Sequence, residues 1–228
     1  MTNAMTAAIP ADEHPLRTHH GRRAVISREE LIHAALALLG PNRSVSTHSL
    51  REVAREAGIA PNSFYRHFRD IDELAIALIE LSGSTLRQVF SQARQRASSE
   101  RSVVRTSVEV FMEQLYADEG YLQILMREGK VGSEAFKMAV ERQLQYFEDE
   151  LQNDLIRLEK AHGTLLQHPA TVARAITRLV FTMGAMATTL PRERHGDVLE
   201  QTVVMLRMLL AGARVLPPEG GARARAGA

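Results

Sequence analysis

The sequence contains no cysteine among its 228 residues, which excludes disulfide bonds and metal sites built on thiolates. Its N-terminus has no continuous apolar segment of the signal-peptide type. Its longest apolar stretch, at about 179–190, is too short to cross a bilayer. The alternating pattern of half-buried strands is also missing. We therefore expect an all-α, soluble protein that acts in the reducing cytoplasm and has no membrane partner.

Signatures of enzymes are scarce as well. None of the nine histidines has the spacing of a zinc site such as HExxH, and no glycine-rich loop of the phosphate-binding type is present. No Ser/His/Asp arrangement is legible. We expect no catalytic residue, no metal site and no cofactor.

The formal net charge of +1 conceals an uneven distribution. Residues 17–69 hold nine arginines and four glutamates, a net charge of +5, whereas the rest of the chain holds 19 basic and 23 acidic residues, a net charge of −4. A basic segment on an acidic body favours a polyanionic partner at one end. Chance scatter of the charges is the alternative.

Start and stop signals predict a series of helices. Capping boxes, in which a serine precedes a glutamate by three residues, open the first two helices at Ser27 and Ser49. Pro61 suits the first turn of a third helix that ends near Phe68, and Asp70 opens a long fourth helix. Further helices are expected at about 102–117, 120–128, 133–160, 169–189 and 194–213.

The stretch 50–68, "LREVAREAGIAPNSFYRHF", predicts a helix-turn-helix. Its apolar residues form an inner face, and its polar residues are left outside. The apolar set is Leu50, Val53, Ile59, Phe64 and Phe68. The polar set on the second helix is Asn62, Ser63, Tyr65, Arg66 and His67. Arginine bonds guanine through two donors, asparagine reads adenine, and serine, tyrosine and histidine reach phosphates. A helical hairpin with a solvated polar face is the alternative.

The motif "SLREVAREAGIAPNSFYRHFRDIDELAIAL" resembles the DNA-binding domain of the TetR family of bacterial transcriptional regulators, and the resemblance is dense over Ser27–Leu78. Gly58, Phe64, Tyr65 and Phe68 are its most specific part. It implies a three-helix DNA-binding domain followed by a larger helical domain for ligand binding and dimerisation. The DNA-contacting positions that it implies are Ser49, Arg51, Pro61, Asn62, Ser63, Tyr65, Arg66 and His67.

Two residues depart from the family pattern. Ala60 replaces the common serine cap of the recognition helix, so that Pro61 must preset this helix without a side-chain acceptor. Ile71 stands where many members carry a phosphate-binding lysine. A hydrophobic residue there is shared with one branch, the repressors of unsaturated fatty acid biosynthesis (FabR and DesT type). "LRQ", "QARQR", "RTSV" and "FME" extend the likeness to this branch as far as about residue 113.

The larger part of the chain fits a dimeric receptor. The segments 169–189 and 194–213 are apolar around most of their circumference, which predicts a four-helix dimer interface, with a monomeric core as the alternative. Seven of the nine methionines lie beyond residue 110, together with most of the aromatic residues, as in a pocket for a flexible apolar ligand. The candidate ligand-binding residues are Phe111, Met112, Tyr116, Met126, Phe147, Phe181 and Met183. A methionine-rich core without a ligand is the alternative.

These signals divide the chain into a flexible basic arm (1–26), a helix-turn-helix DNA-binding domain (27–72), a ligand-binding and dimerisation domain (73–214) and a disordered tail (215–228). The resemblance implies a homodimeric repressor on an inverted-repeat operator in double-stranded DNA, which senses a long-chain acyl thioester of coenzyme A or acyl carrier protein. Arg87, Arg94, Arg96, Arg101 and Arg105 are candidates for the coenzyme A phosphates, or they form a solvated charged face. The rival functions are a repressor that senses a drug or aromatic effector, a helical acyl-thioester enzyme and a non-specific DNA-packaging protein.

Overall fold

A computed structural model of the chain describes residues 26–39, 44, 47–96, 100–117, 120–163 and 166–217. Almost all of the expected basic arm, with Arg17, Arg22 and Arg23, and most of the expected tail lie outside these ranges. Every regular element within the ranges is helical, and none of the described residues forms a strand, which confirms the all-α prediction.

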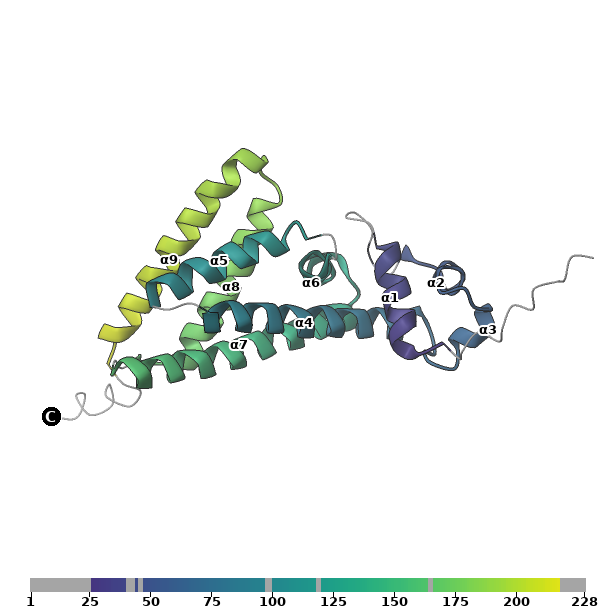
Figure 1. Ribbon diagram of the computed structural model, residues 1–228, viewed down its shortest axis with the longest axis horizontal. Helices are drawn as coiled ribbons and strands as arrows, with labels where there is room; N and C mark the ends of the chain where they lie inside the picture. The colour runs from purple at the N-terminus through teal and green to yellow at the C-terminus, as the bar shows by residue number, and fades with distance from the viewer. Residues whose placement is uncertain are drawn as a thin grey trace, which may run out of the picture.

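The helices and their bounds are α1 (Arg28–Leu38), α2 (Leu50–Glu56), α3 (Pro61–Phe64), α4 (Ile71–Arg96), α5 (Glu100–Gln114), α6 (Tyr121–Val131), α7 (Glu134–His162), α8 (Pro169–Ala187), the 3₁₀ turn η2 (Arg192–Arg194) and α9 (His195–Val215). Figure 1 shows α1, α2 and α3 grouped at one end of an elongated molecule, with α8 and α9 toward the other end. Helix α4 runs lengthwise between the two ends.

The first two helices begin where the capping boxes predict. The hydroxyl groups of Ser27 and Ser49 each accept a hydrogen bond from the backbone N–H three residues on, and the glutamates there accept one in return. Between α2 and α3 the chain turns at Gly58, whose φ of 65° lies in the left-handed region that favours glycine. Phe64 and Phe68 are fully enclosed, and both belong to the same buried core as the apolar residues of α1 and α4.

Helix α3 is shorter than the sequence predicts. Its α-helical part ends at Phe64, and the next residues continue in a tighter turn that leads to Phe68. The N–H groups of Arg66 and His67 bond the carbonyl groups of the third residue before each, at 3.3 and 3.0 Å. Ala60 provides no side-chain cap, so little stabilises a longer α-helix here. Three residues of the polar set, Tyr65, Arg66 and His67, therefore lie on the turn after α3.

The body of the molecule is a bundle of α4 through α9, in which α7 packs against both α4 and α8. Close approach is possible where a side chain is missing. A Cβ atom on Gly184 of α8 would lie only 2.5 Å from the ring of Phe111 on α5. Ion pairs connect α7 to α8. The buried carboxylate of Glu148 on α7 accepts hydrogen bonds from two arginines of α8, Arg174 at 3.2 Å and Arg178 at 2.9 Å. None of the described helices is long and apolar enough to cross a membrane.

Candidate nucleic-acid interface and internal cavity

The outer surface of α2 and α3 carries most of the residues expected to contact DNA. The exposed residues are Arg51, Pro61, Asn62, Tyr65 and Arg66. For Tyr65, 60% of the residue surface is accessible to solvent. Aromatic residues are enriched at interfaces relative to the rest of a protein surface. The neighbouring Phe64 is fully buried beneath Tyr65, with 6.0 Å between ring centroids. A rigid apolar layer therefore supports a polar, cationic surface.

Ser49, Ser63 and His67 are less free to bind DNA. The Ser49 hydroxyl donates to the Glu52 carboxylate at 3.0 Å, so a phosphate contact from it requires this bond to open. Ser63 and His67 are half-buried, and Nε2 of His67 is enclosed without a hydrogen-bond partner among the described residues. The DNA contacts expected from Ser49, Ser63 and His67 stay predictions.

An internal cavity of about 130 Å³ lies between α4, α5, α7, α8 and α9. Four phenylalanines surround part of it: Phe90, Phe111, Phe147 and Phe181. Their neighbouring rings have centroids 5.5 to 5.9 Å apart in tilted and edge-on arrangements. Most of the remaining lining is leucine, isoleucine and valine. The cavity is thus suited to an apolar molecule.

The predicted ligand-binding residues divide between this cavity and other places. Phe111, Phe147 and Phe181 line the cavity, whereas Met112, Met126, Met183 and Tyr116 do not. Met112 and Met183 are buried in the core, and Met126 is partly buried against it. None of the described lining residues is a methionine, so the expected methionine-rich pocket wall is not found here.

Tyr116 belongs to a separate cluster near the turn between α8 and α9. Its ring stacks on His195, with centroids 5.0 Å apart and a 3.0 Å contact between the hydroxyl oxygen and Nε2. Partial burial raises the pKa of Tyr116 above its usual value, while the nearby Arg192 cation opposes that shift. The cluster joins the end of α5 to the start of α9.

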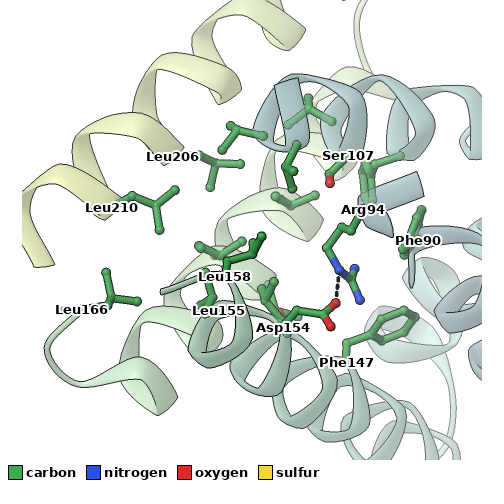
Figure 2. Close-up of a pocket in the computed structure, with 18 of the residues that line it drawn as sticks. Phe90, Arg94, Ser107, Phe147, Asp154, Leu155, Leu158, Leu166, Leu206 and Leu210 are labelled. Carbon is green, nitrogen blue, oxygen red and sulfur yellow. Dashed lines mark hydrogen bonds and ion pairs between the residues drawn. The ribbon is translucent and has the colours of Figure 1, made fainter. Parts of the chain in front are cut away.

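One end of the cavity is charged. Figure 2 shows Arg94 of α4 reaching into the cavity to Asp154 of α7, near Ser107, Phe90 and Phe147. The Nε of Arg94 donates to Asp154 at 2.5 Å, and only 12% of the Arg94 side chain and 9% of the Asp154 side chain are exposed. Arg157 donates to the other oxygen of the same carboxylate. The Ser107 hydroxyl oxygen is enclosed without a hydrogen-bond partner among the described residues.

The other arginines considered for coenzyme A phosphates have different surroundings. Arg87 donates to Glu150 and Gln143, and Arg105 binds both carboxylate oxygens of Glu200 at 2.7 Å. Arg96 is exposed, and the side chain of Arg101 lies outside the described part of the structure. The interaction with Glu200 raises the pKa of Arg105 and lowers that of Glu200. Two of these arginines are thus already paired with acidic residues, as in a charged face.

The last two helices are only partly buried within one chain. Val204 and Met208 of α9 and Met186 of α8 are exposed, as is Val215 at the end of α9. Leu206, by contrast, is buried and lines the cavity. A charged substitution at Leu206 would therefore destabilise a single chain and would not test whether two chains associate. Apolar side chains exposed on neighbouring helices are typical of a surface that another molecule covers.

Sequence reasoning missed the polar end of the cavity. Asp154 and Ser107 have the pattern of ordinary polar residues in helical segments, and the sequence offers Arg94 only as a candidate for a coenzyme A phosphate or as part of a solvated charged face. The available signal was weak: an arginine and an aspartate 60 residues apart, each in a segment rich in polar residues. Only the packing of α4 on α7 brings the two together.

Comparison with known proteins agrees with this architecture. Residues 31–78 match the model of the family described as bacterial regulatory proteins, tetR family. This segment covers α2, α3 and parts of α1 and α4, and thus includes the whole exposed polar surface.

Solved structures of bacterial regulators have the same fold over most of the chain. The reduced form of NemR from E. coli is 19% identical, with a TM-score of 0.65 over 80% of this chain and 97% of its own. A TetR-family transcriptional regulator from Pectobacterium atrosepticum is 19% identical, with a TM-score of 0.63 over 83% and 95%. The fatty acid degradation regulator FadR from Bacillus halodurans is 15% identical, with a TM-score of 0.62 over 82% and 96%. These structures show that the fold is shared over most of the chain, and the family match is confined to its N-terminal helices.

Proposed function

We propose that this chain is a TetR-family transcriptional regulator, a cytoplasmic repressor that binds an inverted-repeat operator as a homodimer and is controlled by a hydrophobic effector. One observation carries this proposal. The exposed polar surface belongs to α2 and α3 and the apolar cavity lies in the body, and Figure 1 shows α4 running from the group of α1, α2 and α3 into the body. The same helix contributes Leu74 and Leu78 to the packed core and Phe90 and Arg94 to the cavity wall.

In the DNA complex, Asn62, Ser63 and Arg66 read base edges and Tyr65 binds a phosphate. The exposure of Arg66 and Tyr65 beside the rigid Phe64 supports these roles. An arginine bonded to guanine through two donors discriminates against the wrong base by about 1–3 kcal/mol, whereas a phosphate contact carries no direct sequence information. Arg66→Ala should therefore relax base preference at one operator position, and Tyr65→Phe should weaken binding to all sequences about equally. A binding-site selection with each variant tests this division, and an unchanged base preference in Arg66→Ala contradicts it.

The homodimer forms through α8 and α9. Their exposed apolar residues support this arrangement, because an isolated chain would leave Val204 and Met208 in water. A two-fold dimer places its two recognition surfaces symmetrically, and the operator is then an inverted repeat. Analytical ultracentrifugation of the purified protein at micromolar concentration tests the dimer, and a monomer at that concentration contradicts it.

The effector is a long-chain acyl thioester, and the regulated genes are those of unsaturated fatty acid biosynthesis. The sequence resemblance to the FabR and DesT type supports this assignment, and so does an internal cavity with a largely apolar lining. Affinity should rise with chain length until the cavity is full, by about 0.8 kcal/mol for each buried methylene group. Because a double bond bends the chain, saturated and monounsaturated ligands should differ in their effect on operator affinity.

The experiment is a titration of saturated and monounsaturated acyl-coenzyme A of equal chain length into an operator-binding assay. A difference between the two ligands supports lipid sensing. Identical effects, or no effect from either ligand, remove lipid sensing and leave the repressor itself untouched.

A second candidate is a repressor that senses a drug or another aromatic compound. The ring cluster formed by Phe90, Phe111, Phe147 and Phe181 favours it, because aromatic rings stack on aromatic ligands at these spacings. Native mass spectrometry of freshly purified protein, with a search for a co-purified ligand, separates the two candidates.

A further inference from the structure

The cavity lining is mostly apolar, and its charged residues are Arg94, Asp154, Glu159 and Arg214, the last of them one helical turn beyond Leu210 on α9. In Figure 2, Leu166, Leu206 and Leu210 lie on one side, and Arg94, Ser107 and Asp154 lie on the other. An effector recognised by apolar contact alone needs no charge in its cavity. A buried ion pair adds little to stability compared with apolar residues of the same volume, so the fold does not require this pair either.

Arg94 retains unused hydrogen-bonding capacity. Its described contact with Asp154 uses only Nε, which leaves the two terminal nitrogens of the guanidinium group as donors. The buried Ser107 hydroxyl next to this end also lacks a partner among the described residues. The remaining charged lining residues, Glu159 and Arg214, already interact with other groups.

The local charge balance favours an electron-rich ligand group. Asp154 lies between two arginines, Arg94 and Arg157, so that the three groups together carry a net charge of +1. Because Arg157 also holds Asp154, a ligand oxygen that draws Arg94 away does not leave the aspartate unpaired. Replacing one partner of a buried charge while the other stays in place avoids most of the penalty for an unpaired ion.

We propose that Arg94 and Ser107 form the headgroup site of the cavity and bind the oxygen of an acyl group, either a carboxylate or a thioester carbonyl, while the acyl chain extends toward Leu166, Leu206 and Leu210. The inference rests on the proposed role of this cavity as the effector site. It adds the orientation of the ligand and the chemical group that distinguishes an acyl compound from any other apolar molecule of the same size.

The test is isothermal titration calorimetry with decanoate, decanoyl-coenzyme A and 1-decanol, which share one chain length. For the wild type we expect at least one of the two acyl compounds to bind about tenfold or more tightly than the alcohol, as a charged hydrogen bond implies. The arm that binds more tightly, free acid or thioester, identifies the source of the acyl oxygen.

Three variants locate this preference. Arg94→Met should abolish most of the advantage of the acyl compound over the alcohol. Ser107→Ala should weaken acyl binding several-fold without unfolding the protein, because its hydroxyl has no partner to lose among the described residues. Arg142→Met, which removes an exposed arginine of α7 that does not line the cavity, is the control and should change nothing.

Two results separate the possible failures. If 1-decanol binds as tightly as both acyl compounds, or if Arg94→Met and Ser107→Ala leave the ratio unchanged, the headgroup site is refuted and hydrophobic sensing stands. If none of the three compounds binds the wild type, the series is repeated with palmitate, palmitoyl-coenzyme A and 1-hexadecanol, and no binding in that series refutes both the headgroup site and the acyl effector. The comparison of ligands on the wild type distinguishes these outcomes even if Arg94→Met does not fold.

Discussion

Met208 offers the sharpest test of the proposed dimer, because the chain contains a matched control. Met208 on α9 and Met138 on α7 leave 68% and 66% of their surface exposed in a single chain. The two side chains are therefore almost equally exposed to solvent in a monomer. In a monomer, Met→Glu at either position places the new charge in water. Only a partner that covers α9 makes the two substitutions differ.

The expected magnitude follows from that exposure. Complete burial of a methionine side chain contributes about 1.5–3 kcal/mol, and Met208 exposes roughly two thirds of its surface, so covering it contributes about 1–2 kcal/mol in each subunit. Two-fold symmetry doubles this to about 2–4 kcal/mol per dimer. Met208→Glu should then raise the dimer dissociation constant by roughly 30- to 800-fold before the cost of burying a carboxylate is added.

The assay is sedimentation velocity over a concentration series, with circular dichroism to verify that both variants remain helical. Met208→Glu should sediment as a monomer at concentrations where the wild type and Met138→Glu are dimers. It should also lose affinity for an inverted-repeat operator while keeping affinity for a single half-site. Equal dissociation constants for the two variants would refute the placement of the interface on α9.

Three further expectations concern stability and the link between the two ends of the molecule. The hydrogen bond from Arg178 lowers the pKa of Glu141, so its stabilisation is complete above the ordinary pKa of 4.5 and is lost as the pH falls further; Glu141→Gln should flatten the pH dependence of the unfolding free energy in that range. Ser44 donates to the fully buried carboxylate of Glu128 at 3.0 Å, and Ser44→Ala should lower the unfolding free energy by about 1.5–3 kcal/mol in chemical denaturation. Phe64→Ala should cost about 3–5 kcal/mol and abolish operator binding, as measured by denaturation and gel shift, because the ring is fully enclosed.

Local signals predicted the helices well, since each depends on a few neighbouring residues. The capping boxes at Ser27 and Ser49 form as expected, and Pro61 opens α3 without a side-chain cap from Ala60. The predicted end of α3 was wrong, because the sequence pattern does not distinguish an α-helix from a tight turn that keeps the same apolar residue, Phe68, in the core.

The cavity was harder to predict, because it depends on which helices meet. Composition suggested a methionine-rich pocket, yet methionine fills gaps in a core as readily as it lines a binding site, and Met112 and Met183 are core residues. The three phenylalanines chosen as ligand contacts do line the cavity. Arg94 and Asp154 meet only through the packing of α4 on α7, over a separation of 60 residues that no local pattern records.

In the proposed repressor, α4 transmits the effect of a bound effector to the DNA-binding helices. It runs unbroken through 26 residues, a length of about 39 Å, from Ile71 beside the DNA-binding helices to Arg96, just past the cavity wall at Arg94. A tilt of roughly 5° about the cavity end moves Ile71 by roughly 3 Å, and a two-fold dimer applies the same shift to both recognition surfaces. An effector drives this tilt only if it binds the two orientations of α4 with different affinity. A headgroup held by Arg94 supplies such a difference, because the donor and its helix move together relative to Asp154 on α7. The contact of the acyl oxygen with Arg94 then determines which orientation of α4 the ligand favours, while the apolar part of the ligand supplies most of the affinity.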